Sequence, residues 1–203
     1  CRNKTQAPTD TVSSGVIKIS VDESFRPLIQ EEIDVYEGLY PAAGLIPDYT
    51  SEVEAINLLL KDSVRLTVST RRLTEAEING LQEKKLFPKE IKIATDGIAL
   101  ITHKQNAELD PKSKLGKIQV VFDNSNSSTI RYAIDSLCKG QPLYQGLTAL
   151  GTNPQVIDYV AKTPNALGVI GVSWIGNKAD STNLSFSERI NVMRISRENP
   201  ALV

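Results

Sequence analysis

The sequence is poor in the residues that bind transition metals. It contains one histidine, His103, and two cysteines, Cys1 and Cys138, among 203 residues. A structural zinc site usually takes four cysteine and histidine ligands, so these three are too few for one. No D-x-D-x-D-G loop of the calcium-binding type is present either. We therefore expect a protein without a metal and without a cofactor; a site for a hard cation made of carboxylates alone is the alternative.

Long apolar runs and an excess of basic residues are also missing. The longest apolar stretches, such as GIALIT and LGVIGVSWI, have the length of strands and fall short of the roughly 18 residues of a membrane span. A formal net charge of −1 argues against a nucleic-acid partner, because such proteins usually carry a basic surface. With 40% hydrophobic and 23% charged residues, the composition is that of a soluble globular protein.

What the chain does contain is an alternation of strand-like and helix-like segments from Gly15 onward. The apolar patterns predict strands at 15–21, 44–49, 64–69, 91–104 (two runs), 117–122 and 166–176. Helical spacing and capping residues predict helices at 22–40, 50–62, 70–84, 128–139 and 153–165. This order implies a mostly parallel α/β sheet, whose ligands bind beyond the carboxyl ends of the strands.

Hydroxyl side chains gather at four of the predicted strand-to-helix turns. They are Ser24, Thr50 with Ser51, Ser69 with Thr70, and Ser127 to Thr129. One such turn is explained by ordinary helix capping. Four together, with Arg71, Arg72 and Arg131 nearby, suggest an oxyanion site, because helix N-termini, hydroxyls and guanidinium groups all donate hydrogen bonds to anions.

Three segments resemble the phosphate-binding proteins of bacterial ABC transporters, particularly their lipoprotein forms. They are VVFDNSNSSTIRYAIDSL (120–137), AKTPNALGVIGVSWI (161–175) and LTVSTRRLTEAE (66–77). In that family a G-S-G-T-type loop opens a helix and wraps phosphate, and SSTIR stands at its place. NALGVIGVSW is similar to the family's GAIGY strand. The resemblance extends from Gly15 to Pro200.

The resemblance implies a two-lobed α/β fold of the type II periplasmic binding protein kind, with an anion cleft between the lobes. Residues 15–100 and 172–203 are expected in lobe 1 and residues 101–171 in lobe 2, with crossing strands near 97–103 and 168–176. The implied phosphate ligands come from four loops: Ser24 and Phe25; Thr50 and Ser51; Ser69 and Thr70; Ser127, Ser128 and Thr129.

The chain departs from the family's charge pattern at two places. Thr70 stands where the family often has an aspartate that accepts a proton from phosphate, and Asp123 stands where an arginine commonly precedes the fourth loop. We therefore expect at least one of Arg71, Arg72 and Arg131 to contact the anion. The alternative is that all three form only ion pairs with surface carboxylates. The carboxylate that accepts the phosphate proton is expected first at Asp123 and then at Asp22 or Glu23. For Asp123, a role as a turn cap is an equal alternative.

The first fourteen residues form a polar tail that begins with Cys1. The tail is interpreted as a flexible tether, and Cys1 as the lipid-bearing first residue of a mature lipoprotein after removal of a signal peptide; a free terminal thiol is the alternative. We expect a monomer in the periplasm, held at the membrane only by its lipid anchor. Its partners would be inorganic phosphate and the permease and ATPase of an ABC transporter.

Two other functions are kept as alternatives to phosphate capture for transport. A binding lipoprotein that senses an oxyanion without delivering it has the same sequence features. A phosphate-ester hydrolase is less favoured, because only His103 could serve a serine nucleophile as base and because GVSWI lacks the closing glycine of G-x-S-x-G. The Walker motif G-x-x-x-x-G-K-[ST] is absent as well, so we expect no enzymatic activity.

Overall fold

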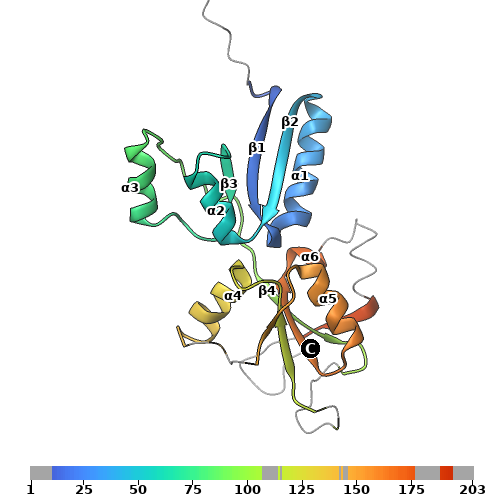
Figure 1. Cartoon of the computed structure of the whole chain (residues 1–203). Helices are drawn as coiled ribbons and strands as arrows, with labels where there is room; N and C mark the ends of the chain where they lie inside the picture. The colour runs from blue at the N-terminus through green and yellow to red at the C-terminus, as the bar shows by residue number, and fades with distance from the viewer. Residues whose placement is uncertain are drawn as a thin grey trace, which may run out of the picture. The chain divides into compact units, whose positions relative to one another are not determined.

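The computed structural model describes residues 11–106, 114, 116–141, 143, 146–176 and 188–193. They form two compact units, each with its own sheet and helices (Figure 1). Unit 1 contains residues 11–22 and 28–90, and unit 2 contains residues 23–27 and the described residues from 91 onward. The predicted α/β class is confirmed. Within the described part of the chain, no helix is long and apolar enough to cross a membrane.

Unit 1 is built on a three-stranded parallel sheet in the order β2-β1-β3. Its strands are β1 (Ser14–Asp22), β2 (Ala42–Thr50) and β3 (Leu66–Val68), and its helices are α1 (Arg26–Leu39, in unit 1 from Leu28), α2 (Glu52–Leu60) and α3 (Glu75–Glu83). Tyr49 of β2 donates to Gln30 of α1 at 2.9 Å, and α1 runs alongside β2 (Figure 1). As the apolar spacing predicts, Ile29 and Ile33 of α1 are buried.

Unit 2 is built on a five-stranded mixed sheet in the order β6-β5-β7-β4-β8, in which β4 is antiparallel to both neighbours. Its strands are β4 (Ile98–His103), β5 (Gln119–Phe122), β6 (Thr148–Ala149), β7 (Ala166–Gly171) and β8 (Ile190–Val192). Its helices are the 3₁₀ turn η1 (Glu23–Phe25), α4 (Ser128–Tyr132), the π-helical η2 (Ala133–Leu137), α5 (Asn153–Lys162) and α6 (Ser173–Gly176).

Successive residues of β5 and β7 serve opposite faces of this sheet, as the two-residue period of a strand requires. Val121 and Ile170 belong to the core under α5, whereas Phe122 and Val169 belong to the core under α4. At Gly168 of β7 a Cβ would lie 2.7 Å from Ile101, 2.8 Å from Val160 and 2.9 Å from Val156. Glycine therefore lets α5 approach the sheet closely at Val156 and Val160.

Several predicted boundaries differ from the structure. Residues 91–97 form no strand, and Ile91 and Ile93 are exposed, so only the second predicted run, β4, pairs. The predicted strand over 166–176 ends at Gly171, because Val172 is followed by the short helix α6. Residues 172–176 and 188–193, expected in lobe 1, belong to unit 2, since β8 pairs with β4.

Candidate functional site

Buried polar side chains collect in unit 2 where several chain segments begin or end. Between 0% and 8% of each is exposed, although burying polar groups is costly unless they are hydrogen-bonded. They come from η1, the end of β5, the start of α4 and the start of α5. We call them the unit 2 cluster: Glu23, Ser24, Asp123, Ser127, Ser128, Thr129 and Asn153.

A chain of hydroxyls begins at the N-cap of α4 and ends on a carboxylate. Ser127 caps the helix by accepting from the N–H of Ile130 at 3.3 Å. Thr129 donates to Oδ1 of Asp123 at 2.6 Å, and the oxygens of Ser127 and Thr129 lie 2.7 Å apart. Because a carboxylate only accepts and Thr129 has a single proton, Ser127 is the donor in that second bond. Asp123 therefore orients both hydroxyls.

Asn153 joins three segments of the cluster through its fully buried side chain. Its Nδ2 donates to Oε2 of Glu23 at 2.6 Å and to Oδ2 of Asp123 at 3.4 Å. Its Oδ1 accepts from the N–H of Gly171, at the end of β7, at 3.2 Å. These partners fix the orientation of the amide, because the Gly171 N–H can only donate and carboxylates can only accept.

Ser24 and Ser128 bring the first and fourth predicted loops together. Their hydroxyl oxygens lie 3.3 Å apart, and both side chains are buried. Ser173 of α6 donates to the backbone carbonyl of Ser24 at 2.5 Å. A Cβ on Gly171 would lie 3.4 Å from the same carbonyl oxygen, so glycine leaves room for the first loop beside the end of β7.

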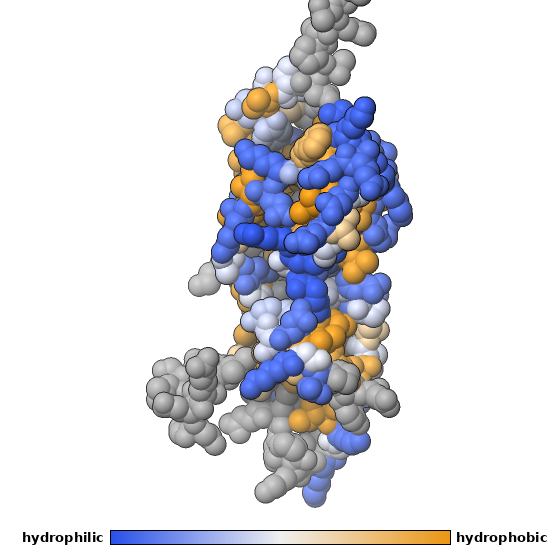
Figure 2. Space-filling view, turned by 90° about the vertical axis from the view of Figure 1, so that its left-hand side faces the viewer, coloured by the Kyte–Doolittle hydropathy of each residue, from blue (hydrophilic) through white to orange (hydrophobic). Residues whose placement is uncertain are grey.

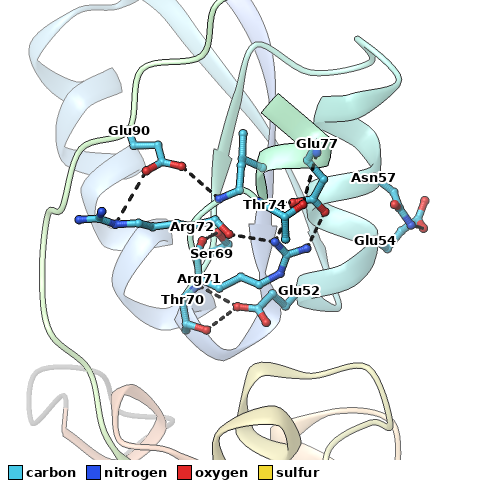
Figure 3. Close-up of polar contacts among 11 residues, drawn as sticks. Glu52, Glu54, Asn57, Ser69, Thr70, Arg71, Arg72, Thr74, Glu77 and Glu90 are labelled. Carbon is cyan, nitrogen blue, oxygen red and sulfur yellow. Dashed lines mark hydrogen bonds and ion pairs between the residues drawn. The ribbon is translucent and has the colours of Figure 1, made fainter. Parts of the chain in front are cut away.

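In unit 1, Thr70 is held by a buried carboxylate (Figure 3). Oε1 of Glu52, whose side chain is 1% exposed, accepts from the Thr70 N–H at 3.0 Å and also from the Thr70 hydroxyl. Glu52 occupies the first turn of α2, where an acidic side chain is favoured by the helix dipole. The structure thus places a carboxylate at the third loop, although residue 70 itself is a threonine.

Arg71 makes a two-pronged ion pair with Glu77 (Figure 3). Its Nη1 and Nη2 atoms each lie 2.8 Å from a carboxylate oxygen of Glu77. These bonds lower the pKa of Glu77 to about 2 and raise the pKa of Arg71. Glu77 also closes the capping box of α3 by accepting from the Thr74 N–H at 2.7 Å. The guanidinium therefore supports the start of α3.

The other two candidate arginines also lie beside carboxylates. Nε of Arg72 is 3.9 Å from Glu90, and the Arg72 side chain is 90% exposed. Nη1 of Arg131 is 3.6 Å from Asp135 one helical turn later. All three thus have the ion pairs that the surface alternative requires. Whether one of them also contacts an anion stays a prediction.

The remaining predicted residues fall into three groups. Phe25, Thr50, Ser51 and Ser69 are partly buried. Ser51 caps α2 by accepting from the N–H of Glu54 at 3.3 Å, and the Ser69 hydroxyl donates to the Arg71 carbonyl at 2.8 Å. Asp22, a candidate acceptor, is buried in unit 1. Cys1 lies outside the described residues.

Two residues that the sequence did not single out, Glu52 and Asn153, are central to these arrangements. Both occupy the first turn of a helix directly after a capping hydroxyl, Ser51 or Thr152. An acidic or amide residue at that position is common on a solvated surface. Their burial, at 1% and 0% exposure, was the missing information, and it depends on packing that no local pattern encodes.

The described residues thus define a two-unit α/β binding-protein fold with a buried polar cluster at the helix starts of unit 2. A family model described as "PBP superfamily domain" matches residues 5–202, and the chain belongs to that family. The predicted resemblance to periplasmic-binding-protein-like proteins is thereby confirmed at the level of the superfamily.

Solved structures of two kinds of protein share the fold. A protein from Clostridium perfringens, assigned as a phosphate ABC transporter substrate-binding protein and solved with bound phosphate, has a TM-score of 0.61 at 18% identity, covering 93% of this chain and 88% of its own. An ABC-type phosphate transport receptor from Vibrio cholerae has a TM-score of 0.51 at 17% identity, covering 89% and 76%. The regulatory domain of OxyR2 from Vibrio vulnificus, as a C206S mutant, has a TM-score of 0.66 at 13% identity, covering 97% and 85%. No curated protein matches the chain.

Proposed function

We propose that the chain is an extracytoplasmic solute-binding protein that captures inorganic phosphate for uptake by an ABC transporter. The observation that carries the proposal is the pairing of Ser24 with Ser128 at 3.3 Å, which unites two predicted phosphate loops in one buried cluster. Anion receptors combine hydroxyls with the N–H groups of helix starts, and unit 2 offers both at Ser128. The likeness to the phosphate-bound Clostridium perfringens protein supports the same ligand.

The proposal assigns roles to the two units separately. In unit 2, the hydroxyls of Ser24 and Ser128 would donate to phosphate. Ser127 and Thr129, whose hydroxyl protons go to Thr129 and Asp123, would hold the loop in shape and offer backbone N–H groups. In unit 1, the loops with Thr50, Ser51, Ser69 and Thr70 would contribute further donors, and Glu52 would hold Thr70 in place. The protein would release its ligand unchanged to a permease and its ATPase, and Cys1 would carry a lipid anchor.

Alanine replacements in the cluster test the proposal. We expect Ser24→Ala and Ser128→Ala each to weaken phosphate binding at least tenfold in isothermal titration of ligand-stripped protein, as the loss of a hydrogen bond to a charged ligand implies. Ser63→Ala, an exposed serine of unit 1, is the matched control and should bind phosphate normally. If the parent protein binds no phosphate, or if both cluster variants bind it like the parent, the proposal is wrong.

A sensing role is the second candidate, since the OxyR2 regulatory domain shares the fold over 97% of this chain. The two candidates predict the same ligand but different partners. Reconstitution separates them: phosphate uptake by vesicles that contain a phosphate permease and its ATPase should depend on added protein if the chain serves transport. A sensor would bind phosphate equally well and leave uptake unchanged.

A further inference from the structure

We propose that Asn153 is the positioning residue of the anion site, and this rests on the proposed function. Its side-chain amide donates hydrogen bonds to both Glu23 and Asp123. Asn153 thereby fixes the loop that contains Ser24 and the loop that contains Ser128 relative to each other. Asn153 is fully buried in unit 2 and is not among the residues that the family resemblance implies as ligands.

Two buried carboxylates accept hydrogen bonds from the Asn153 amide. Glu23 and Asp123 are 8% and 1% exposed and accept hydrogen bonds from the same nitrogen, Nδ2 of Asn153, at 2.6 and 3.4 Å. Two like charges that share one hydrogen-bond donor repel each other in a buried environment. An amide directs both of its N–H bonds at the two acceptors without adding charge. Asn153 therefore lets both carboxylates lie next to each other.

Each carboxylate is one step from an anion-binding hydroxyl. Glu23 is joined covalently to Ser24. Asp123 accepts the proton of Thr129 in the first turn of α4, directly after Ser128. Moving either carboxylate would thus change the 3.3 Å separation between the hydroxyls of Ser24 and Ser128.

The other side of the amide is anchored to the sheet. Oδ1 of Asn153 accepts from the N–H of Gly171 at the end of β7, and Asn153 begins α5, which packs closely on β7 at Gly168. The amide therefore has a fixed orientation on a rigid support. Accurate placement of ligand-binding groups depends on such supporting contacts.

An isosteric substitution and its compensating partner test the role. Asn153→Asp keeps the acceptor for Gly171 but turns a third carboxylate toward Glu23 and Asp123. We expect it to weaken phosphate binding at least tenfold. In the double variant Asn153→Asp with Glu23→Gln, residue 23 carries the amide donor and residue 153 the carboxylate acceptor of the 2.6 Å pair. Its phosphate dissociation constant should return to within about threefold of that of the Glu23→Gln single variant.

A matched control separates positioning from general loss of stability. Nδ2 of Asn191 in β8 donates to the carbonyls of His103 and Lys104 at 3.3 and 3.0 Å, so Asn191→Asp removes the same kind of bond outside the cluster. It should lower the melting temperature and leave the phosphate dissociation constant unchanged. Parent-like phosphate binding by Asn153→Asp, or a double variant that regains melting temperature without regaining affinity, overturns the inference.

Amide hydrogen exchange of the ligand-free proteins gives a readout that needs no phosphate. Asn153→Asp should accelerate exchange in residues 23–27 and 127–131 together, whereas Asn191→Asp should affect neither segment. Unchanged exchange in both segments of Asn153→Asp contradicts the positioning role. A parent protein that binds no phosphate contradicts only the proposed function, because the exchange comparison still decides the role of Asn153.

Discussion

The hydroxyl of Thr129 donates a 2.6 Å hydrogen bond to Oδ1 of Asp123, and both residues are buried. The helix start that was expected to donate to an anion is thus itself tied to a carboxylate. A donor committed in this way cannot give the same proton to a ligand. Asp123 therefore accepts a hydrogen bond from its own loop. If it also accepts the proton of phosphate, as predicted, it does so in addition to the bond from Thr129.

Thr129→Val removes this hydroxyl at nearly constant volume. Because a buried carboxylate oxygen then loses a donor, we expect unfolding to become easier by about 1–3 kcal/mol. Phosphate binding should weaken about tenfold or more as the loop relaxes. Thr129→Ser is the control that keeps the hydroxyl and should retain most of the affinity. Titration calorimetry and urea denaturation measure the two effects, and an unchanged dissociation constant in Thr129→Val would place the anion elsewhere.

The ion pair between Arg71 and Glu77 predicts a specific pH dependence of stability. The Glu77 pKa falls from 4.5 to about 2 on folding, so the unfolded state binds the proton more readily. The pair's contribution is complete above pH 4.5 and is lost as the pH falls toward 2. The pair contributes on the order of 2 kcal/mol to the free energy of unfolding. This is less than the full pKa shift would give, because the Glu77 side chain is 19% exposed and solvent screens the interaction.

Urea denaturation from pH 2 to pH 7 measures this effect. The parent should lose more stability than Glu77→Gln as the pH falls below 4.5. Glu75→Gln, which changes an exposed carboxylate in the same helical turn, should follow the parent. Parallel pH profiles for the parent and Glu77→Gln would contradict the assignment.

Lysine replacements decide which arginine contacts the anion. Lysine keeps the charge but loses the planar fork, so a bidentate contact should weaken severalfold and a solvated arginine should not matter. We expect at least one of Arg71→Lys, Arg72→Lys and Arg131→Lys to alter the phosphate dissociation constant by more than twofold. Arg72, at 90% side-chain exposure, is the expected neutral position. Three unchanged constants would leave the surface ion pairs as the complete role of these residues.

Gly168→Ala tests the close packing of α5 on β7. The new methyl group would lie within 2.9 Å of three core side chains, and such overpacking costs about 1–3 kcal/mol. Gly80→Ala is the control, because a Cβ at Gly80 of α3 has no neighbour within 4 Å and alanine favours a helix. We expect thermal melting to show a loss for Gly168→Ala and a gain for Gly80→Ala. Equal melting temperatures for Gly168→Ala and the parent would contradict tight packing at β7.

Interactions between residues close together in the sequence could be predicted, whereas interactions between distant residues could not. Helix capping is a local interaction: the hydroxyls of Ser51, Thr74 and Ser127 each accept from the N–H group three residues later. The reciprocal half of the capping box is described at Thr74 but not at Ser51. Such signals are readable because capping joins residues only three positions apart.

Long-range pairing and burial were not readable in the same way. Residues 91–97 have a strand pattern, yet Ile91 and Ile93 remain exposed, because a strand also requires a neighbour with which to pair. On the face of unit 1 seen in Figure 2, hydrophobic residues lie scattered among hydrophilic ones. The bond between Asn153 and Glu23 spans 130 positions, and no periodicity connects residues so far apart.

Titration of ligand-stripped parent protein and Asp123→Asn with phosphate and sulfate tests whether the protein selects phosphate through a buried carboxylate. Phosphate carries a proton at neutral pH and sulfate does not, so a carboxylate acceptor favours phosphate. We expect the parent to bind phosphate with a dissociation constant of about 1 μM or below and to bind sulfate far more weakly. Asp123→Asn should fold, bind phosphate more weakly than the parent, and show a smaller difference between its phosphate and sulfate affinities. Absence of phosphate binding in the parent, or sulfate binding as tight as phosphate binding, would contradict these expectations.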